Sequence, residues 1–521
     1  MSPHPPSIFN DVIGPVMRGA SSSHCAAALR IGRMARSMMA GQIDSVLVEF
    51  DTKGSLATTH QSQGSDMGLF GGLLGWELTD ERLLNYESGM EQSRIELRID
   101  INPFPTNSPN IYKLTLANEA GQHELIADST GGGMIEIQSI DGVQLSMIGD
   151  CHETLIFHDG DCAALRTRLE QHFDAKQILL HADGKLIEIK GQRFLEAQIQ
   201  AELRLEFAIQ HWLELEQVLP VATPSDMQLP FRSCEEMLAF NGDAKRDLWQ
   251  LAVIYEAARG GLSEEEVLQR MEQIILILQE SVEIGLAGTE YSDRILGPQC
   301  GSFREKMASG GLLDSGMLNE MILQITAMME VKSSMGVIVA APTAGACGAL
   351  PGAVLAAGKV LGLSLREMTL GMMAAGMVGT FIATHSTFAA EKAGCQAECG
   401  AGSGMAAAAL VGMAGGSLQQ TLAASSMALQ NMLGLICDPV ANRVEVPCLG
   451  RNVLAASNAI SCANMAIAGF DAVIPLDQVI HAMDGIGKTM PCELRCTGLG
   501  GLSVTPASKK VEAELKKRCC T

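Results

Sequence analysis

Apolar and polar positions in residues 1–150 follow strand and helix periods in turn, which predicts a mixed α/β domain. Ser45 to Asp51 reads SVLVEFD and alternates like a half-buried strand. Helical periodicity begins at Ala26, with arginines on one face, and a second apolar helix opens at Gly64-Ser65-Asp66 and ends near Trp76. Asp128 to Ile137 (DSTGGGMIEI) predicts a three-glycine turn that leads into a strand.

Residues 151–205 predict a separate small unit. Residues 153–158 (ETLIFH) form a strand pattern, a helix follows from Asp161, and a hairpin surrounds Asp183-Gly184 before a second helix from Glu196. This β-α-β-β-α order is similar to a divergent regulatory domain of the ACT type. A structural spacer and a regulatory unit are both consistent with the pattern.

The pattern changes again after residues 206–235, which we expect to be a linker because their second half, VLPVATPSDMQLPFRS, contains three prolines. Residues 236–521 are nearly continuous helix. Ser263 with Glu266 three positions on forms a capping box at the start of one of these helices. The fold class is therefore predicted as α+β: an N-terminal α/β domain, a small ACT-like α+β unit and a large all-helical C-terminal domain.

Composition restricts the possible partners and the expected cellular compartment of the protein. The chain carries a formal net charge of −22, which argues against a nucleic-acid partner. Gly (54) and Met (29) are abundant while aromatic residues make up 4%, a composition that favours closely packed helices. The stretch MSPHPPSIFND lacks the basic and apolar regions of a signal peptide, so we expect a cytoplasmic protein with reduced thiols among its 15 cysteines.

Three long stretches lack charge, or nearly so, and their length alone would permit membrane spans: residues 335–358, 368–390 and 399–443. They are rich in Gly, Ala, Ser, Thr, Gln and Asn, and Pro342 and Pro351 interrupt the first. We therefore expect buried helices of a soluble core and no membrane partner.

Cysteines in turn-rich segments are candidates for a metal centre. Gly434 to Arg451 (GLICDPVANRVEVPCLGR) places Cys437 and Cys448 11 positions apart, with Arg443 to Val446 alternating like a short strand between them. Cys395, in AGCQAECG, lies 42 positions upstream of Cys437. Zinc usually takes a fourth Cys or His, whereas three thiolates suit a [4Fe–4S] cluster with one iron left open for a substrate hydroxyl.

Other loops suit anions or the cluster. Ser21 to Ser23, next to His24, precede a helix, where hydroxyls and free N–H groups can hold a carboxylate or simply cap the helix. Thr343, Gly345 and Gly348 of APTAGACGALPG expose backbone at another helix start. Cys519 and Cys520 offer thiols to the open iron, with incidental tail cysteines as the alternative.

Together these motifs resemble the iron–sulfur-dependent L-serine dehydratases. The similar segments, in chain order, are GPVMRGASSSHCAAALRIGR, DSTGGGMIEI, AAPTAGACGALPG, GCQAECG, CDPVANRVEVPC with Arg451-Asn452, and MPCELRCTGLGGLSVTP. The resemblance implies a beta-like domain fused to an alpha-like catalytic domain. It also implies a cluster on Cys395, Cys437 and Cys448, and elimination of water from a β-hydroxy amino acid, with pyruvate and ammonia as the products from serine.

The same resemblance implies site residues. Ser21, Ser22, Thr343, Ala344, Gly345 and Arg495 are the expected substrate contacts, Arg495 as a bidentate carboxylate partner or, alternatively, a structural ion pair. The catalytic set expected from it is Ser23, His24 and His60. We expect a small-molecule amino-acid substrate and a homodimer.

This chain departs from the family pattern at two histidines. A GHGTD-like sequence is replaced by Ser62 to Asp66, with Gln63 at the histidine, and an HPN segment is replaced by Ser108-Pro109-Asn110. A late RET motif is altered to Arg495-Cys496-Thr497. Since an amide cannot carry a proton as imidazole can, three interpretations stay open: serine dehydration served by His24 and His60, a related iron–sulfur lyase on another β-substituted amino or hydroxy acid, or an inactive cluster-bearing sensor.

Overall fold

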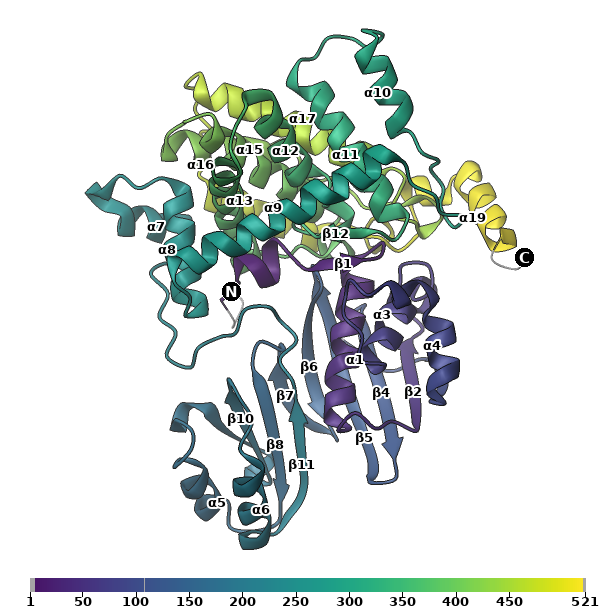
Figure 1. The fold of residues 1–521 in the computed structure, drawn as a ribbon, viewed down its shortest axis with the longest axis vertical. Helices are drawn as coiled ribbons and strands as arrows, with labels where there is room; N and C mark the ends of the chain where they lie inside the picture. The colour runs from purple at the N-terminus through teal and green to yellow at the C-terminus, as the bar shows by residue number, and fades with distance from the viewer. Residues whose placement is uncertain (1–4, 107, 519–521) are drawn as a thin grey trace.

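A six-stranded sheet forms the core of the N-terminal domain in the computed structural model, which describes residues 5–106 and 108–518. Its strand order is β3-β2-β4-β5-β6-β7, with β2 and β3 parallel and the other neighbours antiparallel. The strands are β2 (Ser45–Asp51), β3 (Glu96–Asn102), β4 (Ile111–Asn118), β5 (Gly121–Gly131), β6 (Met134–Ile140) and β7 (Val143–Met147). The α-helices of this part are α1 (Ala27–Met38), α2 (Leu56–Thr59), α3 (Ser65–Leu73) and α4 (Tyr86–Ser93), of which α1 and α3 pack against each other (Figure 1).

The three-glycine turn predicted after Asp128 joins β5 to β6. Gly131, Gly132 and Gly133 all have positive φ, between 64° and 114°, which residues with a Cβ adopt rarely. A Cβ on Gly131 would also lie 2.9 Å from the Cβ of Ala389 in the helical domain. The turn thus needs glycine both for its backbone and for close contact between the two domains.

The small unit has the predicted β-α-β-β-α order, followed by one further strand. Its antiparallel sheet runs β11-β8-β10-β9. The elements are β8 (His152–His158), α5 (Cys162–Leu169), β9 (Ile178–His181), β10 (Leu186–Gly191), α6 (Ala197–Glu206) and β11 (Ile209–Leu215). Strand β11 lies in the range 206–235 that was expected to be linker, so the irregular linker begins only after Leu215. The expectation was wrong here because the proline-rich segment was extended too far back.

Alternate residues of this small sheet belong to two different cores. Ile156 and Ile187 pack with α5 and α6 of the unit itself, whereas their neighbours Leu155 and Leu186 pack into the core of the N-terminal domain. Because successive strand residues point to opposite faces, the sheet is covered on both sides. The unit is therefore packed onto the N-terminal domain rather than tethered by a flexible chain.

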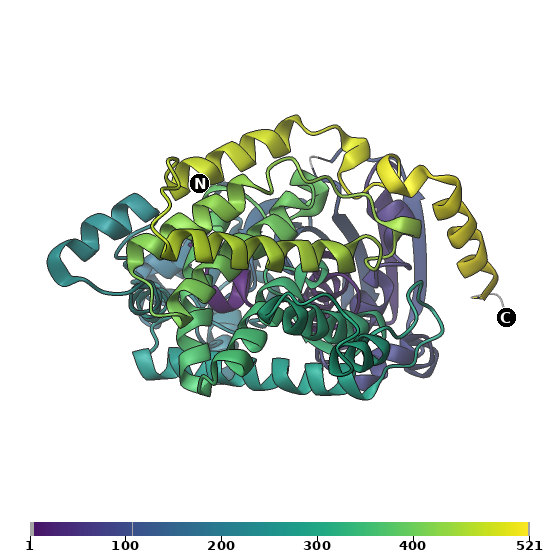
Figure 2. The ribbon, with the colours of Figure 1, turned by 90° about the horizontal axis from the view of Figure 1, so that it is seen from above.

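Helices account for most of the chain beyond residue 233, as the periodicity predicted, and they cover the top of the molecule in Figures 1 and 2. They are α7 (Cys234–Asn241), α8 (Leu248–Gly260), α9 (Glu264–Ala287), α10 (Cys300–Ala308), α11 (Met317–Ser333), α12 (Ala349–Leu361), α13 (Leu365–His385), α14 (Ala390–Ala393), α15 (Ala401–Met413), α16 (Leu418–Gln430), α17 (Cys448–Ile467), α18 (Leu476–Thr489) and α19 (Pro506–Arg518). Ser263 caps α9 with Glu266 in the predicted capping box.

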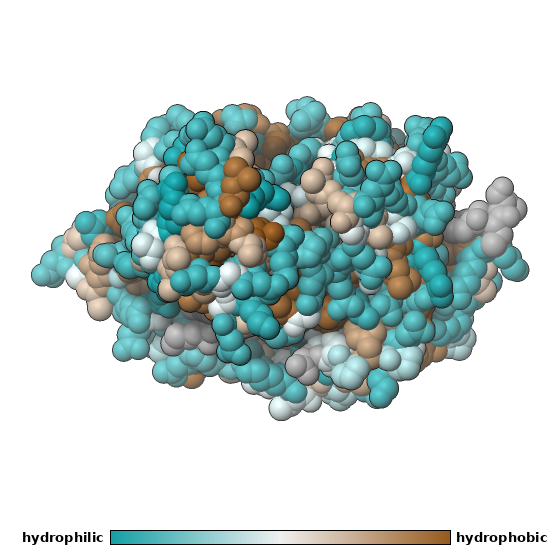
Figure 3. All heavy atoms as spheres, turned by 90° about the horizontal axis from the view of Figure 1, so that it is seen from below, coloured by the Kyte–Doolittle hydropathy of each residue, from teal (hydrophilic) through white to brown (hydrophobic). Residues whose placement is uncertain are grey.

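Helix α13 lies inside this domain and packs against α8, α9 and α15. Two segments, Ala344–Leu361 and Leu365–His385, are long and apolar enough to span a membrane, yet 83% of each is buried inside the protein. This burial agrees with the helical core expected from their small residues. Seen from below, hydrophilic side chains cover most of the surface, with apolar groups between them (Figure 3).

Residues 5–18, which we call the arm, pack against the helical domain although they precede the N-terminal sheet. The arm contains the turn η1 (Ile8–Val12) and strand β1 (Val16–Arg18), which pairs antiparallel with β12 (Val337–Val339). Gly376 and Gly379 of α13 make room for the arm. A Cβ on Gly376 would lie 2.7 Å from Ile8, and a Cβ on Gly379 would lie 2.1 Å from Val12. The arm therefore ties the two large domains together.

Short helical turns complete the chain. They are η2 (Ser22–Ala26), η3 (Glu81–Asn85), η4 (Ala175–Gln177), η5 (Ala182–Gly184), η6 (Gly242–Ala244), η7 (Ala344–Ala346), η8 (Gln396–Gly400), η9 (Val440–Asn442), η10 (Cys492–Leu494) and η11 (Gly501–Val504). Two of them, η2 and η7, contain predicted site residues, and η8 begins directly after Cys395; hydrogen bonds of Ala344 with Ser22 and of Thr343 with Glu398 bring the three turns together where the domains meet.

Candidate active site

Loops of both large domains contact each other through the residues singled out in the sequence. The backbone N–H of Ala344 donates to Ser22 Oγ (3.2 Å), and Ser23 Oγ donates to Glu391 Oε1 (2.9 Å). Arg443 Nη1 donates to the carbonyl of Ser62 (3.2 Å). The serine loop, the 59–66 loop and the loops of the helical domain thus form one continuous polar junction.

The serine loop does more than cap a helix. Ser21 occupies the N-cap position of η2 but makes no capping bond, and its hydroxyl lies 3.0 Å from His24 Nδ1. His24 Nε2 lies 2.9 Å from Thr59 Oγ1, whose proton is donated to the carbonyl of Ser55. Thr59 must therefore accept from Nε2, which leaves Nδ1 as an acceptor. Burial lowers the pKa of His24, so its ring is neutral at pH 7.

His60 is held by a carboxylate. Its Nδ1 lies 2.8 Å and 3.0 Å from the two oxygens of Asp66, and its ring contacts Phe50. Because Asp66 accepts the Nδ1 proton, Nε2 of the neutral ring carries a free lone pair. Asp66 is buried and follows directly on Ser65 at the start of α3, so the pair is fixed to a rigid element.

Cysteines from three segments gather beside this junction. Cys395 precedes η8, Cys437 lies in a loop, and Cys448 is the first residue of α17; all three are at most 6% exposed. Cys395 Sγ, Cys437 Sγ and a carboxylate oxygen of Glu398 all lie within 4.8 Å of one another. Cys448 is linked to this group through Asn452, whose Nδ2 donates to the Cys448 carbonyl (2.9 Å) and lies 4.0 Å from Cys399 Sγ. The structure therefore brings two of the three predicted cluster ligands close together and places Cys448 near them.

Two further thiols, those of Cys399 and Cys496, adjoin these three. Hydrogen bonds from Cys399 and Cys437, together with the Arg451 cation, hold the pKa of Cys395 well below its usual range. Arg451 Nη1 lies 3.6 Å from Cys395 Sγ, and its Nη2 donates to Asp438 Oδ1 (2.7 Å). Cys395 is therefore the thiol most readily ionised, as a metal ligand must be.

Asn452 fixes the Thr343 loop relative to Cys448. Its Oδ1 accepts from the N–H groups of Gly348 (3.0 Å) and Ala349 (2.9 Å), and its Nδ2 donates to the carbonyls of Gly345 (2.8 Å) and Cys448 (2.9 Å). The loop was expected to offer free N–H groups to a carboxylate. The N–H groups of Gly348, Ala349 and Ala344 already have acceptors in the protein. Fewer N–H groups of this loop are therefore available to a carboxylate than the sequence suggested.

Glu398 links the same loop to the thiols. Its Oε1 accepts from Thr343 Oγ1 (2.7 Å), and its Oε2 lies 4.0 Å from Cys395 Sγ. Burial, and then the nearby Cys395 charge, raise the pKa of Glu398 to about 8. Gly345 leaves space for this carboxyl, because a Cβ there would lie 2.9 Å from Oε1.

Several buried donors at or near the junction have no protein acceptor. Among the described residues these include Gln63 Nε2, Asn110 Nδ2 and Arg495 Nε. Asn110 Oδ1 accepts from Ser55 Oγ, next to the His24–Thr59 pair, and Arg495 donates from Nη1 to the carbonyl of Lys392 (3.2 Å). Because buried donors are normally satisfied, these three are suited to a bound anion or water.

Ser108, which stands where the family has a histidine, has a hydrogen-bond partner within the protein. Ser108 Oγ donates to Asp128 Oδ1 (2.7 Å), and burial raises the pKa of Asp128 to about 6. Lys392 of the helical domain opposes that shift, so Asp128 faces the junction. Ser129, the next residue, donates to the carbonyl of Ser23 (2.6 Å) and supports the serine loop.

The strand expected at Arg443 to Val446 is absent, and this expectation was wrong. Ala441 and Asn442 have positive φ, and the four residues lie in a turn instead of pairing with a strand. Arg443 pairs with Asp293 (2.6 Å), and the Glu445 carboxylate accepts the N–H groups of Ile295 (2.8 Å) and Leu296 (2.9 Å). The alternation reflects these contacts rather than a pleated sheet.

Sequence reasoning missed several residues that hold the site together: Thr59, Glu391, Glu398, Asp438 and Asn452. A usable signal existed for Asp438, the one charge in the long uncharged stretch before Arg443, since a buried charge needs a partner and Asp438 has Arg451. The thiols expected to reach the open iron, Cys519 and Cys520, lie outside the described residues.

Comparison with known proteins identifies relatives of this arrangement. The profile of the family described as "Serine dehydratase alpha chain" matches residues 191–503. The probable L-serine dehydratase alpha chain of Bacillus subtilis (strain 168) is 37% identical over 285 residues, which cover 55% of this chain and 95% of that protein. The probable L-serine dehydratase beta chain of the same organism is 39% identical over 153 residues, covering 29% of this chain and 68% of that protein.

A single-chain relative matches as well. L-serine dehydratase 1 of Escherichia coli (strain K12) is 32% identical over 283 residues, which cover 53% of this chain and 62% of that protein. The family profile spans most of the helical domain, including all five gathered cysteines. This chain, with its thiol cluster at the junction of two domains, therefore belongs to the serine dehydratase family.

Proposed function

We propose that this protein converts L-serine to pyruvate and ammonia, using a [4Fe–4S] cluster held by Cys395, Cys437 and Cys448. The observation that carries the proposal is the convergence of three buried thiols with Arg451 at the junction that also contains His24 and His60. Relatives named L-serine dehydratase support the substrate. The reaction removes the Cα proton and the β-hydroxyl of serine as water, and the resulting enamine hydrolyses to pyruvate and ammonia.

The residues present fit such a cluster. Three thiolates leave one iron of a [4Fe–4S] cluster without a protein ligand, and the surroundings of Cys395 already favour its ionised form. When bound, the cluster supplies a Lewis-acidic iron for the substrate hydroxyl. Cys399 and Cys496 are adjacent thiols that can support the ligands by hydrogen bonds to sulfur.

The Cα proton is taken, in this proposal, by Nε2 of His60. Asp66 fixes the ring with Nδ1 protonated, so Nε2 is the free base, in the same way that a carboxylate orients a histidine in hydrolases. His24 has its Nε2 proton committed to Thr59, and its Nδ1 faces the hydroxyl of Ser21. We assign His24 to orienting Ser21 and Ser23 against the substrate.

The substrate carboxylate is placed among the unsatisfied donors of the junction. Gln63, Asn110 and Arg495 each offer a buried N–H group without a protein acceptor. Thr343, Ala344, Gly345 and Ser22 are assigned to the same substrate, and the contact between Ala344 and Ser22 supports this grouping. Gln63, where the family has histidine, thus serves as a hydrogen-bond donor rather than as a proton carrier.

Anaerobic purification tests the cluster and the reaction together. We expect about four iron and four sulfide ions per chain, broad visible absorbance, and pyruvate formation from L-serine faster than from L-threonine or L-cysteine. Cys437→Ser should lose the absorbance and the activity, whereas Cys300→Ser, at another buried thiol, should keep both. A variant at Cys437 that retains full iron content would refute the ligand assignment.

Two alternative functions give different results in the same assay. A related lyase would consume another β-substituted amino or hydroxy acid and leave L-serine unchanged. A sensor would change its cluster absorbance on adding L-serine without releasing pyruvate. A cytoplasmic location and a homodimer belong to the proposal and are tested by cell fractionation and by light scattering of the purified protein.

A further inference from the structure

Glu391 is a carboxylate at the domain junction to which the proposed reaction assigns no role. It belongs to α14, and its side chain is 6% exposed. Its Oε1 accepts the hydroxyl proton of Ser23 (2.9 Å), which lies in the serine loop expected at the substrate. In the described parts of the chain its Oε2 makes no hydrogen bond. A nearly buried carboxylate therefore has a free acceptor beside the serine loop.

No cation neutralises this carboxylate among the residues that the structure describes. His24 Nδ1 lies 3.9 Å from Oε1, but burial lowers the pKa of His24, so its ring is neutral at pH 7. No lysine or arginine within residues 5–106 and 108–518 forms an ion pair with Glu391, and this includes its neighbour Lys392. Because an isolated charge is costly in a nearly buried position, a cationic partner is expected here.

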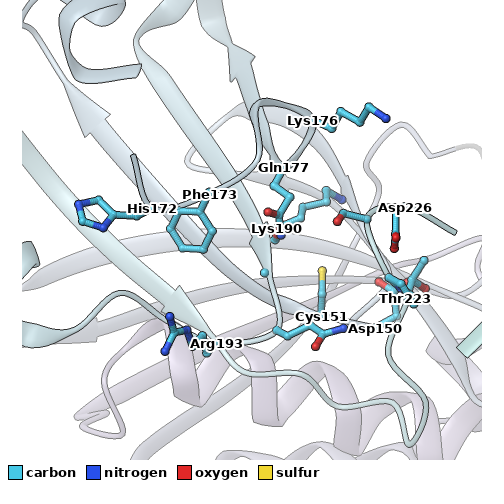
Figure 4. A pocket seen from close by; sticks show the side chains of 14 residues that line it. Asp150, Cys151, His172, Phe173, Lys176, Gln177, Lys190, Arg193, Thr223 and Asp226 are labelled. Atoms are coloured by element: carbon cyan, nitrogen blue, oxygen red, sulfur yellow. The ribbon is translucent and has the colours of Figure 1, made fainter. Parts of the chain in front are cut away.

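Two other buried carboxylates, those of Glu153 and Asp438, have cations of the protein beside them. Glu153 lies 3.4 Å from Lys190, which lines a polar cavity between the ACT-like unit and the linker (Figure 4). Asp438 accepts from Arg451 (2.7 Å) near the thiols. The chain supplies cations at these two positions and none, among the described residues, at Glu391. The cationic partner of Glu391 is then a group from outside the chain.

Both large domains hold this segment in place. Ser129 Oγ of the N-terminal domain donates to the carbonyl of Ser23 (2.6 Å), the residue that Glu391 binds. A Cβ on Gly131 would lie 2.9 Å from the Cβ of Ala389, the N-cap residue of α14. The carboxylate is therefore positioned before a ligand arrives, which lowers the entropic cost of recognising a small molecule.

The residue after Glu391 holds a group that the proposed function assigns to the substrate carboxylate. Arg495 Nη1 donates to the carbonyl of Lys392 (3.2 Å), and Arg495 Nε has no acceptor in the described structure. One short segment thus carries a free carboxylate oxygen and holds a guanidinium with a free donor. An amino acid bears an ammonium and a carboxylate on the same carbon, so a single small molecule presents both complementary charges.

We propose that the Glu391 carboxylate binds the α-ammonium group of the substrate and makes the site selective for amino acids over hydroxy acids. This contact rests on the proposed function, because it is the one that separates L-serine from its hydroxy analogue. Oε2 accepts from the ammonium, while Oε1 keeps the hydroxyl proton of Ser23. A hydroxy acid brings no positive charge, so its binding leaves the carboxylate without a cation.

Calorimetric titration of the anaerobically purified, full-length protein tests the proposal with L-alanine and L-lactate. These two compounds cannot lose a β-hydroxyl, and they differ only in the ammonium or hydroxyl group on Cα. We expect the unmodified protein to bind L-alanine about tenfold or more tightly than L-lactate. Glu391→Gln should raise the Kd of L-alanine by about 10–100-fold, the loss expected for one charge-assisted hydrogen bond, and change that of L-lactate by less than about threefold.

Two further variants separate the charge of Glu391 from other effects. Glu391→Asp keeps the charge and should retain part of the preference for L-alanine. Glu493→Gln is the matched control, because Glu493 is exposed, lies two positions from Arg495 and makes no side-chain hydrogen bond or ion pair in the described structure; its Kd values should not change. An equal loss of affinity for both compounds in Glu391→Gln would overturn the proposal, because it would show that Glu391 only supports Ser23. The absence of a preference for L-alanine in the unmodified protein would overturn it as well.

Serine turnover is measured separately, on the same preparations with their iron content determined. In Glu391→Gln the KM for L-serine should rise by about 10–100-fold with a smaller change in kcat, and an unchanged KM would contradict the ammonium contact. A protein that prefers L-alanine but forms no pyruvate would refute the proposed function and support the contact. A protein that forms pyruvate without this preference would do the reverse.

Discussion

Asn452 offers a sharp test of how the site is built, through the substitution Asn452→Asp. The residue is fully buried on α17, and its side chain makes two accepted and two donated hydrogen bonds to backbone groups at 3.0 Å or less. An aspartate has the same shape and keeps both acceptor contacts. It loses both donors and places a carboxylate oxygen against the carbonyls of Gly345 and Cys448.

The cost can be worked out from these contacts. Each lost bond is worth about 1 kcal/mol net, and each carbonyl left unsatisfied in a buried site adds to that, so we expect about 3 kcal/mol of destabilisation. For domains of about 150–250 residues this corresponds to a fall in Tm of roughly 6–12 °C. The Thr343 loop and Cys448 should also separate, which lowers the amount of iron retained after gel filtration.

The pH dependence has a definite sign. Burial raises the pKa of the introduced carboxyl in the folded protein above its unfolded value near ~3.9. The protonated form is therefore favoured by folding, and stability is lost as pH rises through the folded pKa. The deficit in Tm relative to the unmodified protein should be smaller at pH 5 than at pH 8.

Thermal unfolding followed by circular dichroism at both pH values is the measurement. Asn464→Asp is the matched control, because Asn464 is exposed on the same helix and makes no side-chain hydrogen bond in the described structure. An equal fall in Tm in both variants, or a deficit independent of pH, would show that the four contacts of Asn452 do not carry the predicted energy.

Two other substitutions test the part of the junction that belongs to the N-terminal domain. Asp66→Asn removes the carboxylate that orients His60, and kcat for L-serine should fall by about 10²–10⁴-fold with little change in KM; a change confined to KM would contradict the assignment of His60 as base. Asp128→Asn keeps an acceptor for Ser108 but removes a carboxyl whose pKa is raised to about 6 by burial. Since that raised pKa makes stability fall as pH rises through about 6, the variant should gain about 2–3 kcal/mol over the unmodified protein at pH 8 and nothing at pH 4, by thermal unfolding. Asp100→Asn, at an exposed ion pair, should show no such crossover.

Local patterns sufficed to predict the elements that bury their apolar faces in a regular way. The strand at Ser45–Asp51, the glycine turn after Asp128 and the capping box at Ser263 each depend on residues adjacent in sequence, and all were predicted correctly. The long uncharged helices were also expected in the core. Such features follow from periodicity and backbone sterics alone.

The remainder depends on contacts between distant residues. The arm pairs with β12, which lies more than 300 residues away. Neither Val16–Arg18 nor Val337–Val339 is long enough to be predicted as a strand from the sequence. Strand β11 was hidden by the prolines that follow it. Within the site, the thiols could be chosen from their motifs, but the roles of Glu398 and Asn452 could not, because their contacts with the Thr343 loop span 55 and 107 positions of the chain.

Pairing of the arm with β12 bears on how the enzyme is assembled. In Bacillus subtilis the relatives that this chain matches are named as separate alpha and beta chains. Here one polypeptide links the two domains, so their association is intramolecular, with an effective concentration on the order of millimolar. Even the small contact between the arm and β12 can then form in all molecules, whatever the expression level. A single polypeptide therefore removes the dependence of the junction between the two domains on subunit concentration.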